Sequence, residues 1–281
     1  MIERFNFYDV YGYLLPGTAL LLVIGCPFWL STNRAPSIEL ASALLASVIA
    51  YFAGHLLQLL SREALPSKKL KGGVYRLHSS IMFDHDDKTW DEAFRRRLAG
   101  AIRRHLGLPT DTDEQRRVAF EACRQYLQAG DAKSYAEQFQ GLYALMRGLT
   151  MASILGAALA LGWLLGALLT PYESALFAAA AGTSVAATLL ILWEPASRWS
   201  FWWVVAAAFA VGTSMGSAYS TVPNTPIRMA GLVAVLVIAA RCFYGANRFH
   251  TEQFARNVCL AFYTRTAGTE VGRKARHRYS M

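Results

Sequence analysis

Residues Leu149 to Leu169 read LTMASILGAALALGWLLGALL, a run of apolar and small side chains without one charged group. A helix needs about 20 such residues to cross the roughly 30 Å hydrocarbon layer of a bilayer. The composition of the whole chain agrees, because 54% of its 281 residues are hydrophobic and only 17% are charged. One ordinary soluble domain is less apolar than this. The sequence therefore predicts an all-α, multi-pass membrane protein.

Five further apolar runs bring the predicted number of transmembrane helices to six. The runs are Gly12–Ser31, Leu40–Leu60, Ala175–Trp193, Phe201–Tyr219 and Ile227–Tyr244. The last run contains Arg228 and Arg241. Their Cα atoms lie about 20 Å apart on a helix, and both side chains can extend outward to the interfaces. The predicted fold is therefore a six-span bundle, with Pro16 in the first turn of the first span or at a kink.

The placement of lysine and arginine predicts which side of the membrane each loop occupies. The segment 61–148 carries sixteen of the 28 basic residues, and the tail after Tyr244 carries seven more. With six spans these segments fall on one side, whereas only Arg34 and Arg228 fall in the loops of the other side. Both termini and the segment 61–148 are therefore predicted to be cytoplasmic.

These spans divide the chain into four parts. Residues 1–60 hold the first two spans, 61–148 a helical cytoplasmic domain, 149–244 the other four spans, and 245–281 a basic helix and tail. In the tail, an apolar stripe recurs at helical spacing and predicts packing on the cytoplasmic domain. The stripe consists of Phe254, Val258, Ala261 and Phe262.

Three helices are expected in the cytoplasmic domain. Capping boxes at Thr89–Glu92 and Thr112–Gln115 are typical of the starts of the first two helices. The third follows Asp131, and no helix-breaking residue separates it from Leu149. We therefore expect it to continue directly into the third span.

His55 is the ionisable side chain that lies well inside a predicted span, about 9 Å from its cytoplasmic end. A polar side chain in hydrocarbon is costly unless it is paired, so we expect His55 to hydrogen-bond another protein group. The candidates near the same depth are Asp9, Tyr13, Gln58 and Arg241. A structural polar lock is the preferred interpretation, and a functional histidine is the alternative.

Two other charged stretches were considered as binding sites. Arg273, Lys274, Arg276 and Arg278 favour anionic lipid headgroups, since the tail is already tethered at a membrane, and make nucleic acid the weaker alternative. Asp84-His85-Asp86-Asp87 has metal-ligand residue types, but consecutive residues rarely converge on one ion. These acids are instead expected to precede a helix N-terminus. The sequence predicts no metal site, no cofactor and no disulfide among the four cysteines.

The content of the spans bears on the class of function. They hold no Asp, Glu or Lys, which counts against ion-coupled transport and intramembrane catalysis. A passive channel or small-solute facilitator remains open, lined by Thr213, Ser214, Ser217 and Ser220. The small-residue motifs Gly162-xxx-Gly166 and Gly212-xxx-Gly216 allow either an oligomer interface or, as we favour, packing within one bundle.

The segments Phe5-Asn-Phe-Tyr-Asp-Val-Tyr-Gly-Tyr-Leu-Leu-Pro-Gly17 and Tyr51-Phe-Ala-Gly-His-Leu-Leu-Gln58 resemble a group of uncharacterised bacterial inner-membrane proteins. That group has the same layout of two spans, a cytoplasmic domain and further spans, and some members are encoded among anti-phage defence genes. The resemblance covers about the first sixty residues. It implies a bacterial inner membrane and is compatible with a role in defence. We therefore expect a non-enzymatic, oligomeric effector or signal-relay protein that senses a cytoplasmic partner or ligand.

Overall fold

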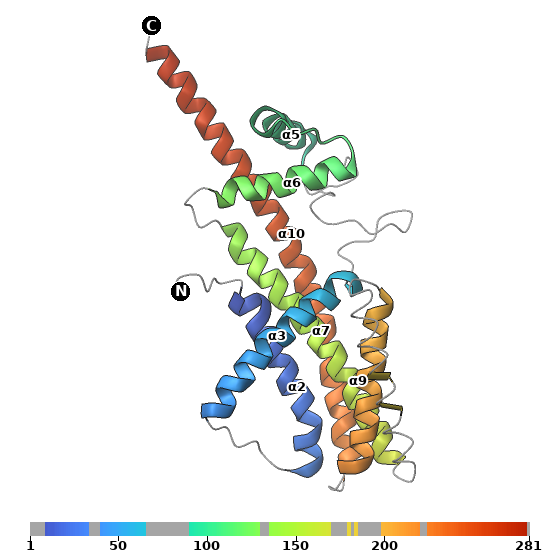
Figure 1. The fold of residues 1–281 in the computed structure, drawn as a ribbon. Coiled ribbons are helices and arrows are strands. Elements are labelled where there is room, and N and C mark those ends of the chain that lie inside the picture. The colour runs from blue at the N-terminus through green and yellow to red at the C-terminus, as the bar shows by residue number, and fades with distance from the viewer. Residues whose placement is uncertain are drawn as a thin grey trace. The chain divides into compact units, whose positions relative to one another are not determined.

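The computed structural model describes residues 9–33, 40–65, 90–129, 135–169, 179–180, 183–184, 198–219 and 224–279, all helices and their connections (Figure 1). The chain forms two compact units. The membrane unit comprises Met1–Leu65 and Gly141–Asn247, and the helical unit comprises Pro66–Gln140 and Arg248–Met281.

Seven α-helices and one π-helical turn make up the described residues. In chain order they are η2 (Val10–Leu14), α2 (Leu15–Thr32), α3 (Leu40–Ala64), α5 (Glu92–Leu106), α6 (Asp113–Gln128), α7 (Tyr135–Leu168), α9 (Arg198–Tyr219) and α10 (Thr225–Tyr279).

Five stretches of these helices are long and apolar enough to cross a membrane within the described part of the chain. They are Val10–Thr32, Ser42–Arg62, Gln138–Leu168, Phe201–Tyr219 and Thr225–Ala267. The chain is therefore a multi-pass helical membrane protein. The fourth predicted span, Ala175–Trp193, falls almost entirely outside the described residues, so the predicted number of six stays a prediction.

Two helices run through the boundary between the units without a break. α7 begins in the helical unit and continues into the apolar run after Leu149, as the lack of a helix breaker predicted. α10 is a single helix of 55 residues that joins the sixth predicted span to the basic tail. Residues 244–248 are helical, so the backbone passes from the predicted span into the tail without interruption.

The helical unit has a core of its own, formed by α5, α6 and α10. Val258 and Phe262 of α10 are fully buried there with Leu98 and Ile102 of α5, and Phe254 and Ala261 pack against the same core. The apolar stripe predicted for the tail is thus confirmed. Cys123 of α6 also lies in this core, and burial raises the pKa of its thiol to about 12.

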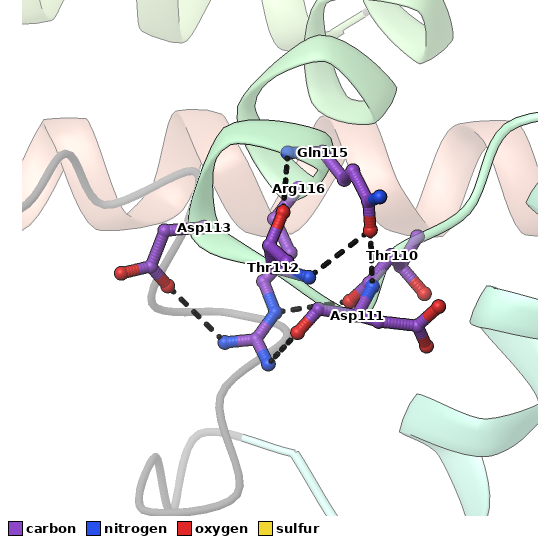
Figure 2. A network of polar contacts seen from close by, with 6 residues as sticks. All are labelled: Thr110, Asp111, Thr112, Asp113, Gln115 and Arg116. Carbon is purple, nitrogen blue, oxygen red and sulfur yellow. Dashed lines mark hydrogen bonds and ion pairs between the residues drawn. The ribbon is translucent and has the colours of Figure 1, made fainter.

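The starts of α5 and α6 test the predicted capping boxes. For α6 the box is confirmed, because the Thr112 hydroxyl accepts from the Gln115 amide at 3.3 Å and the Gln115 side chain accepts from the Thr112 amide at 3.1 Å (Figure 2). For α5 the predicted cap is wrong. Asp91 is the N-cap and accepts from the Phe94 amide, since its carboxylate stands three residues before that orphan donor.

The connection between α5 and α6 is held by one arginine. Arg116 donates to the carbonyl oxygens of Thr110 and Asp111 at 3.0 and 3.1 Å and pairs with Asp113 at 3.4 Å (Figure 2). Gly107 ends α5 at φ 68°, a left-handed conformation that glycine adopts without strain. The turn is therefore specified by its own sequence.

Close glycine contacts pack α7 against α9 in the membrane unit. A Cβ added at Gly162 would lie 1.9 Å from the Phe209 carbonyl oxygen, and one at Gly212 would lie 2.0 Å from that of Leu159. Gly166 and Gly216 meet backbone of the opposite helix in the same way. Both small-residue motifs therefore serve packing within the bundle, as favoured from the sequence.

Candidate functional site: a polar node in the membrane unit

Gln58 of α3 is the centre of a polar node that joins three parts of the membrane unit. The side chain is only 7% exposed. Its amide nitrogen donates to the carbonyl oxygens of Gly12 at 2.8 Å and Ala144 at 2.7 Å. Its amide oxygen accepts from Nε and Nη2 of Arg147 at 2.9 and 2.5 Å. One residue thus ties η2 and α3 to α7.

The orientation of the Gln58 amide follows from the chemistry of its partners. The guanidinium of Arg147 can only donate, and the two carbonyl oxygens can only accept. The amide oxygen must therefore face Arg147, and the amide nitrogen must face the carbonyls. Both N–H donors and both lone pairs of the amide are used, so the buried side chain is fully satisfied.

The Gly12 carbonyl is available to Gln58 because of local sequence. The α-helical donor for this carbonyl would be the amide of the residue four positions on, which is Pro16 and has no N–H. Gly12 also lies within the π-helical turn η2, a feature that is frequent at functional sites. The Gly12 carbonyl, which Pro16 leaves without an α-helical donor, thus accepts an interhelical hydrogen bond from Gln58.

Glycines allow these helices to come close enough for the node. A Cβ at Gly17 would lie 1.7 Å from the Ala50 carbonyl oxygen, and one at Gly54 would lie 1.9 Å from that of Tyr13. A Cβ at Gly148 of α7 would meet Pro16 at 2.6 Å. The backbone of α3 is therefore in direct contact with those of α2 and η2 near Gln58, and the backbone of α7 packs against the ring of Pro16.

Three aromatic rings lie near Gln58, one on η2 and two on α3 within two turns of it. The rings of Tyr13 and His55 stack with centroids 3.7 Å apart and planes at 17°. Tyr51 meets the His55 ring edge-on at 4.8 Å. Among the described residues, the contacts of His55 are these ring contacts, and its side chain is exposed on the unit's surface. The structure thus brings Tyr13 to His55 through stacking, and the expected hydrogen bond stays a prediction.

The other predicted members of the lock lie in different places. Asp9 is the residue directly before η2. Arg241 is exposed on α10. The arginine that joins the node is Arg147, which hydrogen-bonds Gln58. The sequence places Arg147 in the cytoplasmic domain and suggests Arg241 instead. The only local sign of the role of Arg147 is its position, two residues before the apolar run that starts at Leu149.

Arg228, at the other end of α10, has a structural partner. Its Nη1 donates to the Leu30 carbonyl oxygen at 2.9 Å, at the C-terminal end of α2. The last carbonyls of a helix lack intrahelical donors and carry partial negative charge, so a cation there is favourable. This contact gives the charge of Arg228 a partner, so the arginine is compatible with an apolar helix that begins beside it.

The hydroxyl groups proposed as a channel lining lie mostly inside the packing of α9. Thr213 and Ser214 are buried, and Thr213 donates to the Phe209 carbonyl of its own helix at 2.9 Å. The Ser214 hydroxyl donates to Val211 at 3.0 Å and that of Ser217 to Ser214 at 2.8 Å. Ser220 lies outside the described residues. The three described hydroxyls therefore donate to carbonyl oxygens of their own helix.

The remaining predicted sites are only partly described. Residues 273–278 continue α10 as a helix, and their side chains are outside the described set, as is the segment Asp84 to Asp87. Within the described residues, no group of three His, Cys, Asp or Glu side chains is placed to hold a metal ion. Comparison of the chain with protein-family models, with curated proteins and with solved structures found no match.

Proposed function

We propose that this protein is a non-enzymatic signal relay or effector of the bacterial inner membrane, with the helical unit and both termini in the cytoplasm. The observation that supports it is the continuity of α7 and α10, which pass from the helical unit into apolar membrane segments without a break. A partner protein or ligand bound by the helical unit then acts on the membrane unit through these helices.

The packing of α10 supplies the input side of such a relay. Val258 and Phe262 belong to the same core as α5 and α6, so a change in how those helices pack acts directly on α10. Packed cores have a small number of discrete arrangements and deform little between them. A change of packing in the helical unit is therefore passed along α10 more readily than it is taken up by local adjustment.

The output proposed for the membrane unit is perturbation of the bilayer by an oligomer. The membrane part of α10 exposes Val235, Val237 and Ile238, and α3 exposes Val48 and Phe52. These apolar faces suit lipid or further copies of the chain. The resemblance to proteins encoded among defence genes supports infection as the triggering event.

A passive channel is the weaker proposal on these grounds. It depends on the hydroxyl face of α9, where Thr213 and Ser214 are buried. The relay needs no polar lining in the resting protein.

The relay can be tested without knowing its trigger. Ile102→Val removes a methylene from the fully buried core of the helical unit and is expected to cost about 1 kcal/mol, which leaves the unit folded. The measured quantity is the maleimide labelling rate of the exposed Cys242 in the membrane part of α10. In the intact chain we expect this rate to change several-fold. A flexible Gly-Ser linker inserted both between Gln140 and Gly141 and between Asn247 and Arg248 should abolish the change.

Two controls accompany this experiment. Val118→Ala alters an exposed apolar side chain of α6 and should leave the Cys242 rate unchanged. The same linker placed after Asn33, where α2 ends, interrupts neither α7 nor α10. An unchanged Cys242 rate in Ile102→Val would refute the relay. Solute flux through liposomes containing the unperturbed protein alone would favour the channel instead.

A further inference from the structure

The described partners of Arg147 leave its positive charge unneutralised. Its contacts are the neutral amide oxygen of Gln58 and the ring of Tyr143, with the guanidinium carbon 5.0 Å from the ring centroid. No carboxylate among the described residues lies within ion-pair distance of this guanidinium. The side chain is half-buried at the edge of an apolar bundle, where an uncompensated charge is costly.

The same contacts hold the guanidinium in a fixed plane. Two N–H groups are bound to one oxygen, and a ring packs over the carbon, so the side chain has lost most of its freedom before any ligand arrives. A guanidinium has five N–H donors, and Gln58 takes two of them. Nη1 has no hydrogen bond to the described residues. A planar, preorganised fork with free donors is the group that suits a phosphate, which it can bind through two parallel hydrogen bonds.

The position of Arg147 along α7 identifies the source of the phosphate. Arg147 lies in the candidate span Gln138–Leu168, two residues before its uninterrupted apolar run begins at Leu149. This end of the apolar run is where lipid headgroups are expected. Arg62, one turn beyond Gln58 on α3, adds a second exposed cation at the same end of that helix.

We propose that Arg147, held by Gln58 and Tyr143, binds the phosphate of an anionic phospholipid headgroup. This site is distinct from the basic tail at residues 273–278 and does not depend on the proposed relay. The bound lipid provides the counter-ion that the described residues of the node do not supply and completes the contact between α3 and α7.

The test compares lipids that differ only in headgroup, using the full chain in detergent. Phosphatidylglycerol, phosphatidylcholine of the same acyl chains, or inorganic phosphate is added, and both the melting temperature and the lipid retained in native mass spectrometry are recorded. We expect phosphatidylglycerol to be retained more and to raise the melting temperature more than phosphatidylcholine, because the choline cation of phosphatidylcholine balances the charge of its own phosphate. Inorganic phosphate that reproduces the full rise would keep the phosphate site and assign it to a soluble ligand.

Matched variants separate this site from general attraction at the interface. Arg147→Gln should weaken phosphatidylglycerol binding by about tenfold or more, because a charged hydrogen-bonded pair is lost. Arg147→Lys keeps the charge without the planar fork and should retain an intermediate affinity. Arg241→Gln removes an exposed arginine from the same unit and should bind like the unaltered protein.

Two results would overturn the proposal. One is an unaltered protein that responds equally to phosphatidylglycerol and phosphatidylcholine and not to inorganic phosphate, and this result needs no variant to fold. The other is a folded Arg147→Gln or Arg147→Lys protein that keeps the full preference for phosphatidylglycerol.

Discussion

Replacing Gly162 with alanine places a methyl group where α7 and α9 already touch. The added Cβ would lie 1.9 Å from the Phe209 carbonyl oxygen and 2.9 Å from the Thr213 amide nitrogen. Contacts of Cβ below 3.0 Å are essentially absent from proteins, so the helices would have to separate by roughly 1 Å. The clashing atoms belong to the backbone, and no side chain can rotate away to relieve the clash.

The cost follows from this geometry. Overpacking by one methyl group costs about 1–3 kcal/mol where neighbours can adjust, and a rigid backbone places this site at the upper end of that range. Gly231→Ala in α10 is the matched control, because nothing lies within 4 Å of its added Cβ. That variant should be neutral or gain up to about 1 kcal/mol from helix propensity. The two variants are therefore expected to differ by about 3 kcal/mol.

Reversible unfolding of the purified protein in mixed micelles, followed by circular dichroism, measures this difference. Equal stabilities within about 0.5 kcal/mol, the spread of ordinary surface substitutions, would refute the close approach of α7 and α9. Gly166→Ala should behave like Gly162→Ala, since its Cβ would lie 1.9 Å from the Thr213 carbonyl oxygen.

Four further predictions can be checked separately. Gln58→Leu removes the four hydrogen bonds that Gln58 makes to Gly12, Ala144 and Arg147 and should cost about 2–4 kcal/mol in the same unfolding assay, whereas Gln125→Leu at an exposed position should be neutral. Because burial raises the pKa of Cys123 to about 12, its thiol should stay unmodified by maleimide at pH 8 until the protein is unfolded. The exposed cysteine of Gln125→Cys should react at once. Labelling of Cys123 in the native protein would contradict its burial. Ser67→Cys and Ser280→Cys should label only after the inner membrane is opened and Asn224→Cys in intact cells, and labelling of positions 280 and 224 from one side would remove the sixth span. Neutralising Arg273, Lys274, Arg276 and Arg278 should weaken binding of the tail peptide to anionic vesicles by about 1 kcal/mol per charge, less at high salt, and unchanged binding would discard the tail as a lipid site.

The features that the sequence predicted are those with a local or periodic cause. Apolar runs gave the spans, the absence of a breaker before Leu149 gave the continuity of α7, and the spacing from Phe254 to Phe262 gave the packing face of α10. The cap of α5 was misplaced by two residues because Thr89 and Asp91 both have capping side chains, and only the folded turn selects one.

The polar node was predicted only in part because its partners are far apart in the chain. Gln58 was named as a member, but its hydrogen bond to Arg147 joins residues 89 positions apart. No spacing rule connects two such residues, and hydropathy placed Arg147 in the domain outside the membrane. The role of Pro16 was recognised as a kink, whereas its effect on the Gly12 carbonyl depends on the side chain that faces it.

The span of chain between Gln58 and its partners also sets an order of events during biosynthesis. The first two helices enter the membrane with Gln58 unpaired on one side, because Ala144 is made 86 residues later. At about 5–20 residues per second, the ribosome reaches it roughly 4–17 s after Gln58. During this interval the amino-terminal hairpin carries an incomplete polar site, which membrane chaperones and quality-control proteases are able to recognise. The polar site is complete only once α7 supplies Ala144 and Arg147 to Gln58.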